Sequence, residues 1–295
     1  MKWTHRSLRK LCKALRRRGV KLSPATLARL LRRLRFSLRT CRKQKAGIRK
    51  RDRDRQFRYL LRLRNCYLAR NWPVISVDGK KKELVGNFKN PGRSWRRRPH
   101  KVLDHDYPSW GKGRASPAGI YDLAHNDGYV VIGVSHETPT FEVEAIRRWW
   151  LDVGRKRYGN TCLLLIEADS GGANDHRKWE WKLALQELAD EFGLTITVTH
   201  FPPGASKWNP IDHRMFSLIS ANWAGQPLRS YETILKHIRT TRSDTGFHCR
   251  ACLDERPYGR RKISAEQKAS IRLNRRSVLP EWNYTIHPRK ARPIS

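Results

Sequence analysis

Residues 163–175 read LLLIEADSGGAND, an apolar run that leads into the acidic residue Asp169. A short apolar run followed by polar residues and glycines is typical of a strand buried inside a sheet. Residues 74–86 read VISVDGKKKELVG, and here a second, mostly apolar run leads into Asp78. Both acids are therefore expected where a buried strand ends, a costly place for a carboxylate unless it is paired or binds a metal.

A third acid, Asp212, follows in the stretch HFPPGASKWNPIDHRMF. It lies in the first turn of a predicted helix, where the positive end of the helix dipole favours a carboxylate. The apolar residues Met215, Phe216 and Ile219 follow three, four and seven positions later, so Asp212 is expected on the face turned to the sheet. Carboxylates from two strand ends and one helix can meet at one point and bind two divalent cations.

Each acid also has an ordinary structural explanation. Asp78 could form a salt bridge with Lys80 or Lys82, Asp169 could make an Asx turn before the glycines, and Asp212 could cap its helix. Three such coincidences in one domain are less probable than one shared cause. We therefore interpret the three acids as a single metal-binding site.

The elements around these acids predict an α/β fold with a mixed sheet. Residues 126–128, Asn-Asp-Gly, are typical of a β-hairpin turn. Right-handed crossovers could make the strands that carry Asp78 and Asp169 neighbours. Strands are expected over 74–77, 84–88, 119–124, 129–134, 162–166 and 195–199, and helices over 141–158, 178–192 and 209–223.

The N-terminal quarter is strongly basic, since residues 1–70 contain 26 lysines and arginines and only two acids, Asp52 and Asp54. A helix is predicted over residues 6–18, and Ser23 is expected to cap a second helix that Pro24 begins. Two helices joined by a short glycine-containing turn are typical of a helix-turn-helix. The arginines on the second helix that are expected to contact DNA are Arg29, Arg32, Arg33 and Arg35. The alternative is a helical hairpin whose arginines only face solvent.

These patterns divide the chain into four parts. Residues 1–40 are expected to form the helix-turn-helix-like DNA-binding segment, and residues 41–70 a basic linker helix. Residues 71–225 are expected to form the catalytic domain that contains the three acids. Residues 226–295 are expected to be a C-terminal extension packed on that domain.

The formal net charge is +37 over 295 residues, which indicates a polyanionic partner. Nucleic acid is the expected partner, because binding of phosphates releases condensed counterions. No apolar run approaches the roughly 20 residues of a membrane-spanning helix, so no membrane partner is expected. Six cysteines are too few for a disulfide scaffold. We expect a soluble, cytoplasmic protein associated with the nucleoid.

Several long motifs carry a family resemblance. SVDGKKKELVGNFKNPGR, AIRRWWLDVGRKRYG, LLLIEADSGGAND, HFPPGASKWNPIDHRMFSLISANWAG and EWNYTIHP resemble the ISAzo-type family of bacterial insertion-sequence transposases. SLRKLCKALRRRG and SPATLARLLRRL resemble the DNA-binding part of that family. The resemblance covers nearly the whole chain. It implies a ribonuclease-H-like DDE catalytic domain with an N-terminal DNA-binding segment.

The resemblance places the catalytic, metal-binding acids of the family on Asp78, Asp169 and Asp212. It implies two Mg²⁺ ions, with Mn²⁺ as a substitute, and double-stranded DNA as partner: the terminal inverted repeats of the transposon and the target DNA. A homo-oligomer on DNA is expected. The implied reaction cleaves the insertion-sequence ends and joins the 3′-OH to target DNA. A DNA-binding remnant that represses the element, or a ribonuclease-H-like nuclease without strand transfer, are the alternatives.

The chain departs from the family at one acid. The family motif has the form KWNKIEHR, whereas this chain reads KWNPIDHR, so Asp212 stands where the family has glutamate. The related mariner transposases use aspartate as the third acid, so the replacement is compatible with activity. Members of the family are expected to begin upstream of the position of Met1, with more of the DNA-binding region.

Other residues near the acids are assigned provisional roles. Lys80, Lys82, Lys207 and Arg214 are candidates for contacts with DNA phosphates, with solvated surface positions as the alternative. Asn209 is expected to cap the helix that carries Asp212, and Trp208 to pack the preceding loop. His200 and His213 could act as general bases, although a metal-activated nucleophile needs none.

Overall fold

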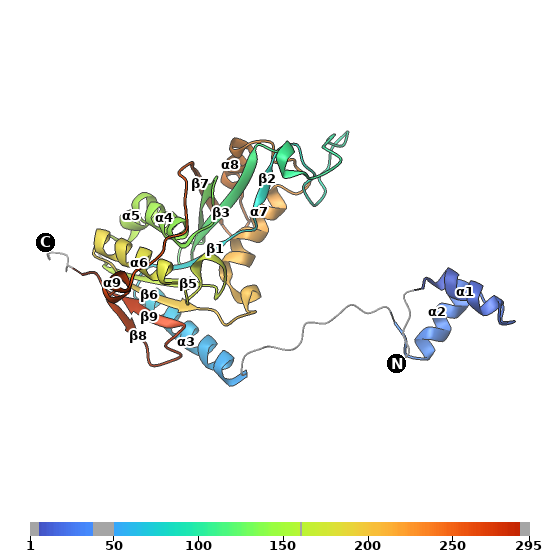
Figure 1. The fold of residues 1–295 in the computed structure, drawn as a ribbon, viewed down its shortest axis with the longest axis horizontal. Helices are drawn as coiled ribbons and strands as arrows, with labels where there is room; N and C mark the ends of the chain where they lie inside the picture. Colours follow the sequence, from blue (N-terminus) through green and yellow to red (C-terminus); the bar gives the residue numbers. More distant parts are fainter. Residues whose placement is uncertain (1–5, 38–49, 160, 290–295) are drawn as a thin grey trace. The chain divides into compact units, whose positions relative to one another are not determined.

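The computed structural model describes residues 6–37, 50–159 and 161–289 (Figure 1). The chain divides into two compact units, Met1–Lys45 and Ala46–Ser295. The expected division into four parts stays a prediction. No helix of the described residues is both long and apolar enough to cross a membrane.

The first unit contains the two predicted helices, α1 (Leu8–Arg16) and α2 (Pro24–Arg33). The Ser23 side chain accepts a hydrogen bond from the Thr26 backbone N–H at 3.0 Å, which satisfies a donor that the helix start leaves open. Leu27 is buried, whereas the four arginines expected to contact DNA are all exposed: Arg29, Arg32, Arg33 and Arg35. The basic face is therefore accessible to a polyanion.

The second unit is built on one mixed sheet with the strand order β7-β4-β3-β1-β5-β6-β9-β8, and β2 pairs with β3. At its centre β1 runs antiparallel to β3 and parallel to β5. The expected α/β class with a mixed sheet is confirmed. The strands are β1 (Val74–Gly79), β2 (Glu83–Val85), β3 (Gly113–Asp122), β4 (Asp127–Gly133), β5 (Leu163–Ala168), β6 (Thr195–His200), β7 (His248–Asp254), β8 (Leu273–Arg275) and β9 (Asn283–Ile286).

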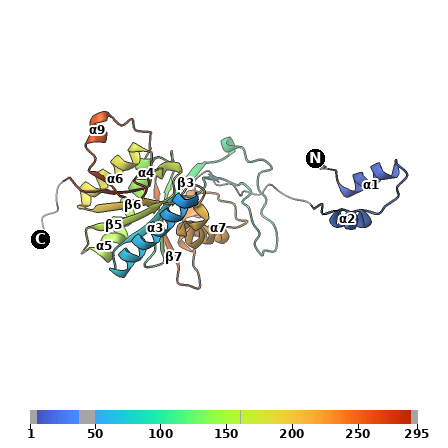
Figure 2. The same ribbon diagram turned by 90° about the horizontal axis from the view of Figure 1, so that it is seen from below.

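Helices cover both faces of this sheet (Figures 1 and 2). On one face, Ile75 and Val77 of β1 pack in a cluster with Trp149 and Trp181 from two helices. These helices are α4 (Pro139–Trp149) and α6 (Trp179–Phe192), and α5 (Arg155–Tyr158) follows α4. The opposite face is covered by α3 (Lys50–Ala69), α7 (Ser217–Asn222) and α8 (Tyr231–Arg239).

The C-terminal residues extend the sheet at both edges. Strand β7 adds to β4 in parallel, and β9 adds to β6 in antiparallel orientation, with β8 beyond it. The described residues 226–289 therefore share the hydrogen-bonded framework of the unit, and α9 (Ala265–Ala269) lies in the connection between its two edges. Their pairing partners lie far away in sequence, so local periodicity could not predict this arrangement.

Two of the predicted helices contain wide turns. The helix expected over 141–158 includes a π-helical turn at Trp150–Gly154, and the helix expected over 209–223 includes a second one, η5, at Asp212–Phe216. Single π-turns inside α-helices often occur at functional sites. The second turn begins at the third predicted acid.

Candidate active site

Asp78 and Asp169 lie at the same edge of the sheet. Asp78 is the fifth residue of β1, and Asp169 directly follows β5. The parallel register pairs Val77 with Ala168, so Asp78 and Asp169 are the next pair along these two neighbouring strands. Because side chains alternate along a strand, both acids lie on the opposite face of the sheet from Val77. This opposite face is the one that α3 and α7 cover.

The third acid approaches this edge from the covering helix. Asp212 begins the π-helical turn η5, and Met215 and Phe216 of that turn press against β3 at Gly119, the residue paired with Asp78. A Cβ atom on Gly119 would lie only 2.5 Å from Met215 Cε and 2.6 Å from Phe216 Cζ. The helix can come this close only because residue 119 has no side chain.

The three carboxylates influence one another electrostatically. Burial, followed by the charges of Asp169 and Asp212, raises the pKa of Asp78 to about 8. Burial and then the charge of Asp212 raise the pKa of Asp169 to about 6. Burial also raises the pKa of Asp212. The charge effects on Asp78 and Asp169 indicate that the three carboxylates lie near one another.

The donor set suits the divalent cation that the resemblance implies, because carboxylate oxygens are preferred ligands of Mg²⁺ and Mn²⁺. In the described part of the chain, no three His, Cys, Asp or Glu side chains lie close enough together to hold one ion. Side-chain rotation would thus have to accompany coordination by all three acids. The expected metal ligands Asp78, Asp169 and Asp212 stay a prediction.

Asn209 connects two of the strand ends. Its Nδ2 donates to Asp169 Oδ1 at 3.1 Å, and its Oδ1 accepts a hydrogen bond from Ser76 Oγ at 2.5 Å. Asn209 is completely buried, so both bonds are shielded from water. The expectation that its side chain caps the following helix is wrong, because the amide is used to orient Asp169 instead.

The lysines after Asp78 pair with other acids. Lys80 Nζ lies 2.8 Å from Glu83 Oε1 and 4.7 Å from the centre of the Trp223 ring. Lys82 Nζ lies 3.7 Å from Glu137 Oε2. In the structure both lysines therefore pair with residues other than Asp78, the salt-bridge partner considered above. Their expected DNA contacts stay a prediction, as do those of the exposed Lys207 and Arg214.

Two further acids beside Asp78 escaped the sequence analysis. A Cβ atom on Gly79 would lie 2.7 Å from Glu137 Oε1 and 3.2 Å from Glu142 Oε1. Glu142 is only 4% exposed, and its Oε1 has no hydrogen-bond partner among the described residues. Burial raises its pKa well above the usual range, and the charges of Glu137 and Asp78 add to this effect. The sequence offered only one local signal for these two acids: they stand before and after Thr138, the residue that caps the helix.

The two histidines differ in position. His200 is completely buried, and burial lowers its pKa to about 3, so it is a neutral group inside the fold and not a base in contact with substrate. His213 is exposed, and its Nε2 contacts the Lys207 carbonyl oxygen. Trp208 packs edge-on against Phe57 with ring centres 6.1 Å apart, yet 57% of it remains exposed.

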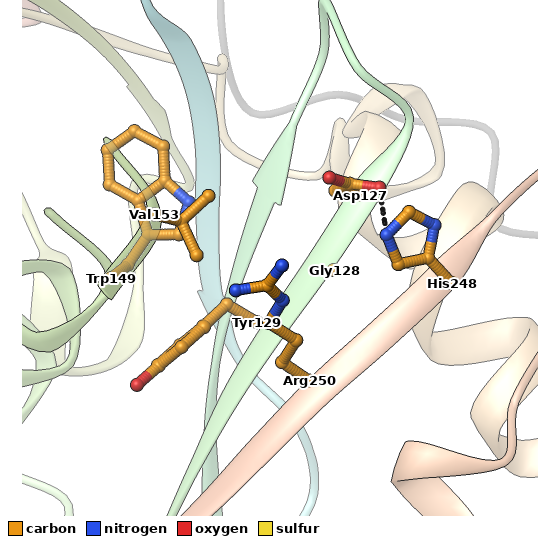
Figure 3. Close-up of a pocket in the computed structure, with 7 residues that line it drawn as sticks. All are labelled: Asp127, Gly128, Tyr129, Trp149, Val153, His248 and Arg250. Atoms are coloured by element: carbon orange, nitrogen blue, oxygen red, sulfur yellow. Dashed lines mark ion pairs between the residues drawn. The ribbon is translucent and has the colours of Figure 1, made fainter. Parts of the chain in front are cut away.

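A small pocket lies at the other end of the sheet (Figure 3). It is lined by residues around the start of β4, where His248 Nε2 lies 2.9 Å from Asp127 Oδ1. Asp127 pairs with Asp122, which lies opposite Ile75 near the beginning of β1, whereas Asp78 lies near its end. The pocket is therefore separate from the three acids.

The raised pKa of Asp78 predicts a pH-dependent stability. The folded protein keeps this proton up to about pH 8, whereas the unfolded chain loses it near 3.8. The free energy of unfolding should therefore fall as the pH rises between these values and then level off. At pH 8 without divalent cations, Asp78→Asn should be more stable than wild type by at least about 1.4 kcal/mol, the equivalent of one pKa unit.

Urea unfolding in EDTA at pH 5 and pH 8 measures this difference. The exposed acid Asp244 supplies the control, because Asp244→Asn should leave the pH dependence of wild type unchanged. If wild type and Asp78→Asn lose the same stability between pH 5 and pH 8, Asp78 is not the cause of the pH dependence.

Several solved structures of Mos1 transposase resemble the chain. The Mos1 transposase paired-end complex with left transposon end is 16% identical, with a TM-score of 0.46, and the match covers 78% of this chain and 65% of that one. The Mos1 mariner paired-end complex with Mn is 14% identical, with a TM-score of 0.45 and coverage of 78% and 65%. The catalytic domain of Mos1 mariner transposase is 12% identical, with a TM-score of 0.42 and coverage of 66% and 82%.

The chain thus spans just under two thirds of the length of the Mos1 chains in the two complexes. No curated protein sequence matches it significantly. The family described as the Rhodopirellula transposase DDE domain matches residues 1–288, almost the entire chain. The resemblance noted in the sequence is confirmed: the chain belongs to this family of DDE transposases.

Proposed function

We propose that this protein is a transposase that cleaves the ends of its insertion sequence and joins the resulting 3′-OH to target DNA. The observation that carries the proposal is the approach of Asp78, Asp169 and Asp212 to one edge of the sheet, in a chain of this family. The charge of Asp212 raises the pKa of both Asp78 and Asp169, which supports a shared environment of the three carboxylates.

The chain's own residues have distinct tasks in this proposal. Asp78, Asp169 and Asp212 would hold two cations, and Asn209 orients Asp169 through the 3.1 Å hydrogen bond to its carboxylate. Bound Mg²⁺, with Mn²⁺ as a substitute, would supply positive charge beside the scissile phosphate and lower the pKa of the attacking water or hydroxyl group. The apolar cluster beneath the site, around Met215 and Phe216, excludes water from its inner side.

The proposed partners are double-stranded DNA at the terminal inverted repeats and at the target. The net charge of +37 favours DNA through counterion release. In the first unit the exposed arginines of α2 and its C-terminal end supply a basic face, formed by Arg29, Arg32, Arg33 and Arg35. Because two ends of an element have to be joined to one target, we propose a homo-oligomer on DNA.

The test is a cleavage and joining assay with duplex DNA that carries the inverted repeats flanking the reading frame. Wild-type protein should nick this DNA in Mg²⁺ or Mn²⁺, leave a 3′-OH and join it to a second duplex, and EDTA should abolish both steps. Binding of the ends without any nicking would contradict the proposal and identify a DNA-binding remnant. Nicking without joining would identify a nuclease.

The aspartate at position 212 allows a sharper prediction. Because Gly119 lets the helix lie directly against β3, we propose that the shorter side chain of Asp212 is matched to this close packing. A glutamate would move the carboxylate by roughly 1 Å, and misplacement on this scale can cost up to about a hundredfold in rate. We expect Asp212→Glu to lower the single-turnover cleavage rate by about tenfold or more.

The comparison is made at equal occupancy of the DNA, measured by a gel-shift titration of both proteins. If Asp212→Glu instead cleaves faster than wild type, the aspartate is a lesion in this copy and the distance argument is wrong.

A further inference from the structure

A line of buried polar groups lies behind Asp169 and crosses three elements. His200 Nδ1, at the end of β6, lies 2.9 Å from the main-chain oxygen of Asp169. His200 Nε2 lies 3.1 Å from the hydroxyl of Tyr284 on β9, and Trp181 Nε1 on α6 donates to that hydroxyl at 3.0 Å. His200, Tyr284 and Trp181 are all completely buried.

The two groups at the ends of this line determine the direction of every hydrogen bond in it. The Asp169 carbonyl can only accept, so His200 Nδ1 carries a hydrogen. The Trp181 indole N–H can only donate, so the Tyr284 oxygen accepts it and its own hydrogen is free for His200 Nε2. The bonds therefore run from Trp181 to Tyr284, then to His200, and finally to Asp169. Each of these buried polar atoms has a partner.

The main chain at Asp169 needs such support. Asp169 has left the sheet ladder, and Ser170, Gly171 and Gly172 follow it, with Gly172 at φ +67°. The segment is otherwise attached to β6 by the bond from Phe201 N to Ala168 O at 2.8 Å and by that from Ser170 Oγ to Phe201 O at 2.5 Å. Of these contacts, only the hydrogen bond from His200 is made with the peptide group of Asp169 itself.

We infer that Tyr284 and His200 are positioning residues that set the orientation of Asp169, so that the C-terminal strand β9 helps to build the metal site. This inference rests on the proposed function. His200 acts on the main chain of Asp169, and Tyr284 acts through His200. Partners that orient a metal-binding group from behind commonly change metal affinity by tenfold to a hundredfold.

Tyr284→Phe isolates the hydroxyl group. The phenyl ring keeps the ring contact with His200, whose centre lies 5.8 Å away, and the contact with Lys182 Nζ at 5.5 Å. Only the acceptor for Trp181 and the donor for His200 are lost. Tyr158→Phe is the matched control, because this buried tyrosine also loses a bonded hydroxyl, which donates to Asp122 at 3.0 Å at the far end of the sheet.

The experiment measures Mn²⁺ binding to the full chain without DNA, from the electron paramagnetic resonance signal of free Mn²⁺. We expect Tyr284→Phe to raise the Mn²⁺ concentration for half-saturation by about tenfold. Tyr158→Phe should stay within about twofold of wild type, even if both variants lower the thermal midpoint equally. A half-saturation unchanged in Tyr284→Phe would overturn the inference.

A second measurement reads the tautomer of His200 in the wild-type protein, and a variant serves only to assign the signal. In protein labelled with ¹⁵N-histidine, the signal lost in His200→Asn should show a protonated Nδ1 and an unprotonated Nε2. The opposite tautomer would overturn the inference. If Asp78→Asn abolishes the Mn²⁺ binding of the wild-type protein but Tyr284→Phe leaves it unchanged, only the positioning role is refuted. Absence of such binding in wild type refutes the proposed function as well.

Discussion

Replacing Asp78 with asparagine is expected to lower Mg²⁺-dependent cleavage of end DNA by at least about a thousandfold, or roughly 4 kcal/mol in the activation free energy. The amide keeps the size and the acceptor oxygen of the side chain but removes its negative charge. The negative charges of Asp169, Asp212 and Glu137 all raise the pKa of Asp78. Loss of this charge would weaken the cation binding on which charge stabilisation at the phosphate depends.

The fold and the DNA affinity of Asp78→Asn should be retained, because among the described residues the Asp78 carboxylate accepts a hydrogen bond only from the adjacent Gly79 N–H, at 2.8 Å. Single-turnover cleavage and a gel-shift titration separate the two effects. Asp244→Asn, which changes an exposed acid, should cleave at the wild-type rate. If Asp78→Asn keeps more than about a tenth of the wild-type rate, the three acids are not the catalytic site.

Replacing Arg64 with methionine is expected to destabilise the protein by about 3–5 kcal/mol, because it leaves a buried carboxylate without its partner. Arg64 of α3 binds Glu167 of β5 with two parallel hydrogen bonds, Nε to Oε1 at 2.7 Å and Nη2 to Oε2 at 2.6 Å. Glu167 is completely buried, and it lies two residues before Asp169 on the same face of the sheet. Burial raises its pKa, and Arg64 opposes that effect.

Urea unfolding at pH 7 measures the change, and two further variants interpret it. Arg62→Met removes an exposed arginine of the same helix and should change stability by less than about 0.5 kcal/mol. The double variant Arg64→Met, Glu167→Met should recover most of the loss, since a buried ion pair is often replaceable by apolar residues. If Arg64→Met alone is as stable as wild type, Glu167 is neutral in the folded protein.

Local sequence signals predicted much of this protein because their physical causes are local. Apolar runs of strand length located β1 and β5, and the acids that follow them were recognised from the cost of a carboxylate at a buried strand end. Ser23 and Pro24 marked the start of α2 through the hydrogen bonds of its first turn. The family motifs, distributed over the whole chain, identified the transposase family.

The partners of the buried polar groups were decided only by the tertiary structure. The sequence suggested that Asn209 is a helix cap, yet its amide connects Ser76 and Asp169. Nothing in the sequence near Gly119 indicated that Met215 and Phe216 would fill the space of its missing side chain.

Long-range pairing also decided how the C-terminal residues join the sheet and how Tyr284 reaches the site through His200. These two residues are 84 positions apart in the chain, as are Thr199 and Asn283 beside them. Periodicity and capping depend on neighbours within one or two turns of the chain and can therefore be seen in the sequence. The partner of a buried hydrogen-bonding group depends on which distant segments the packed core brings together, and that is determined only when the sheet and its helices are assembled.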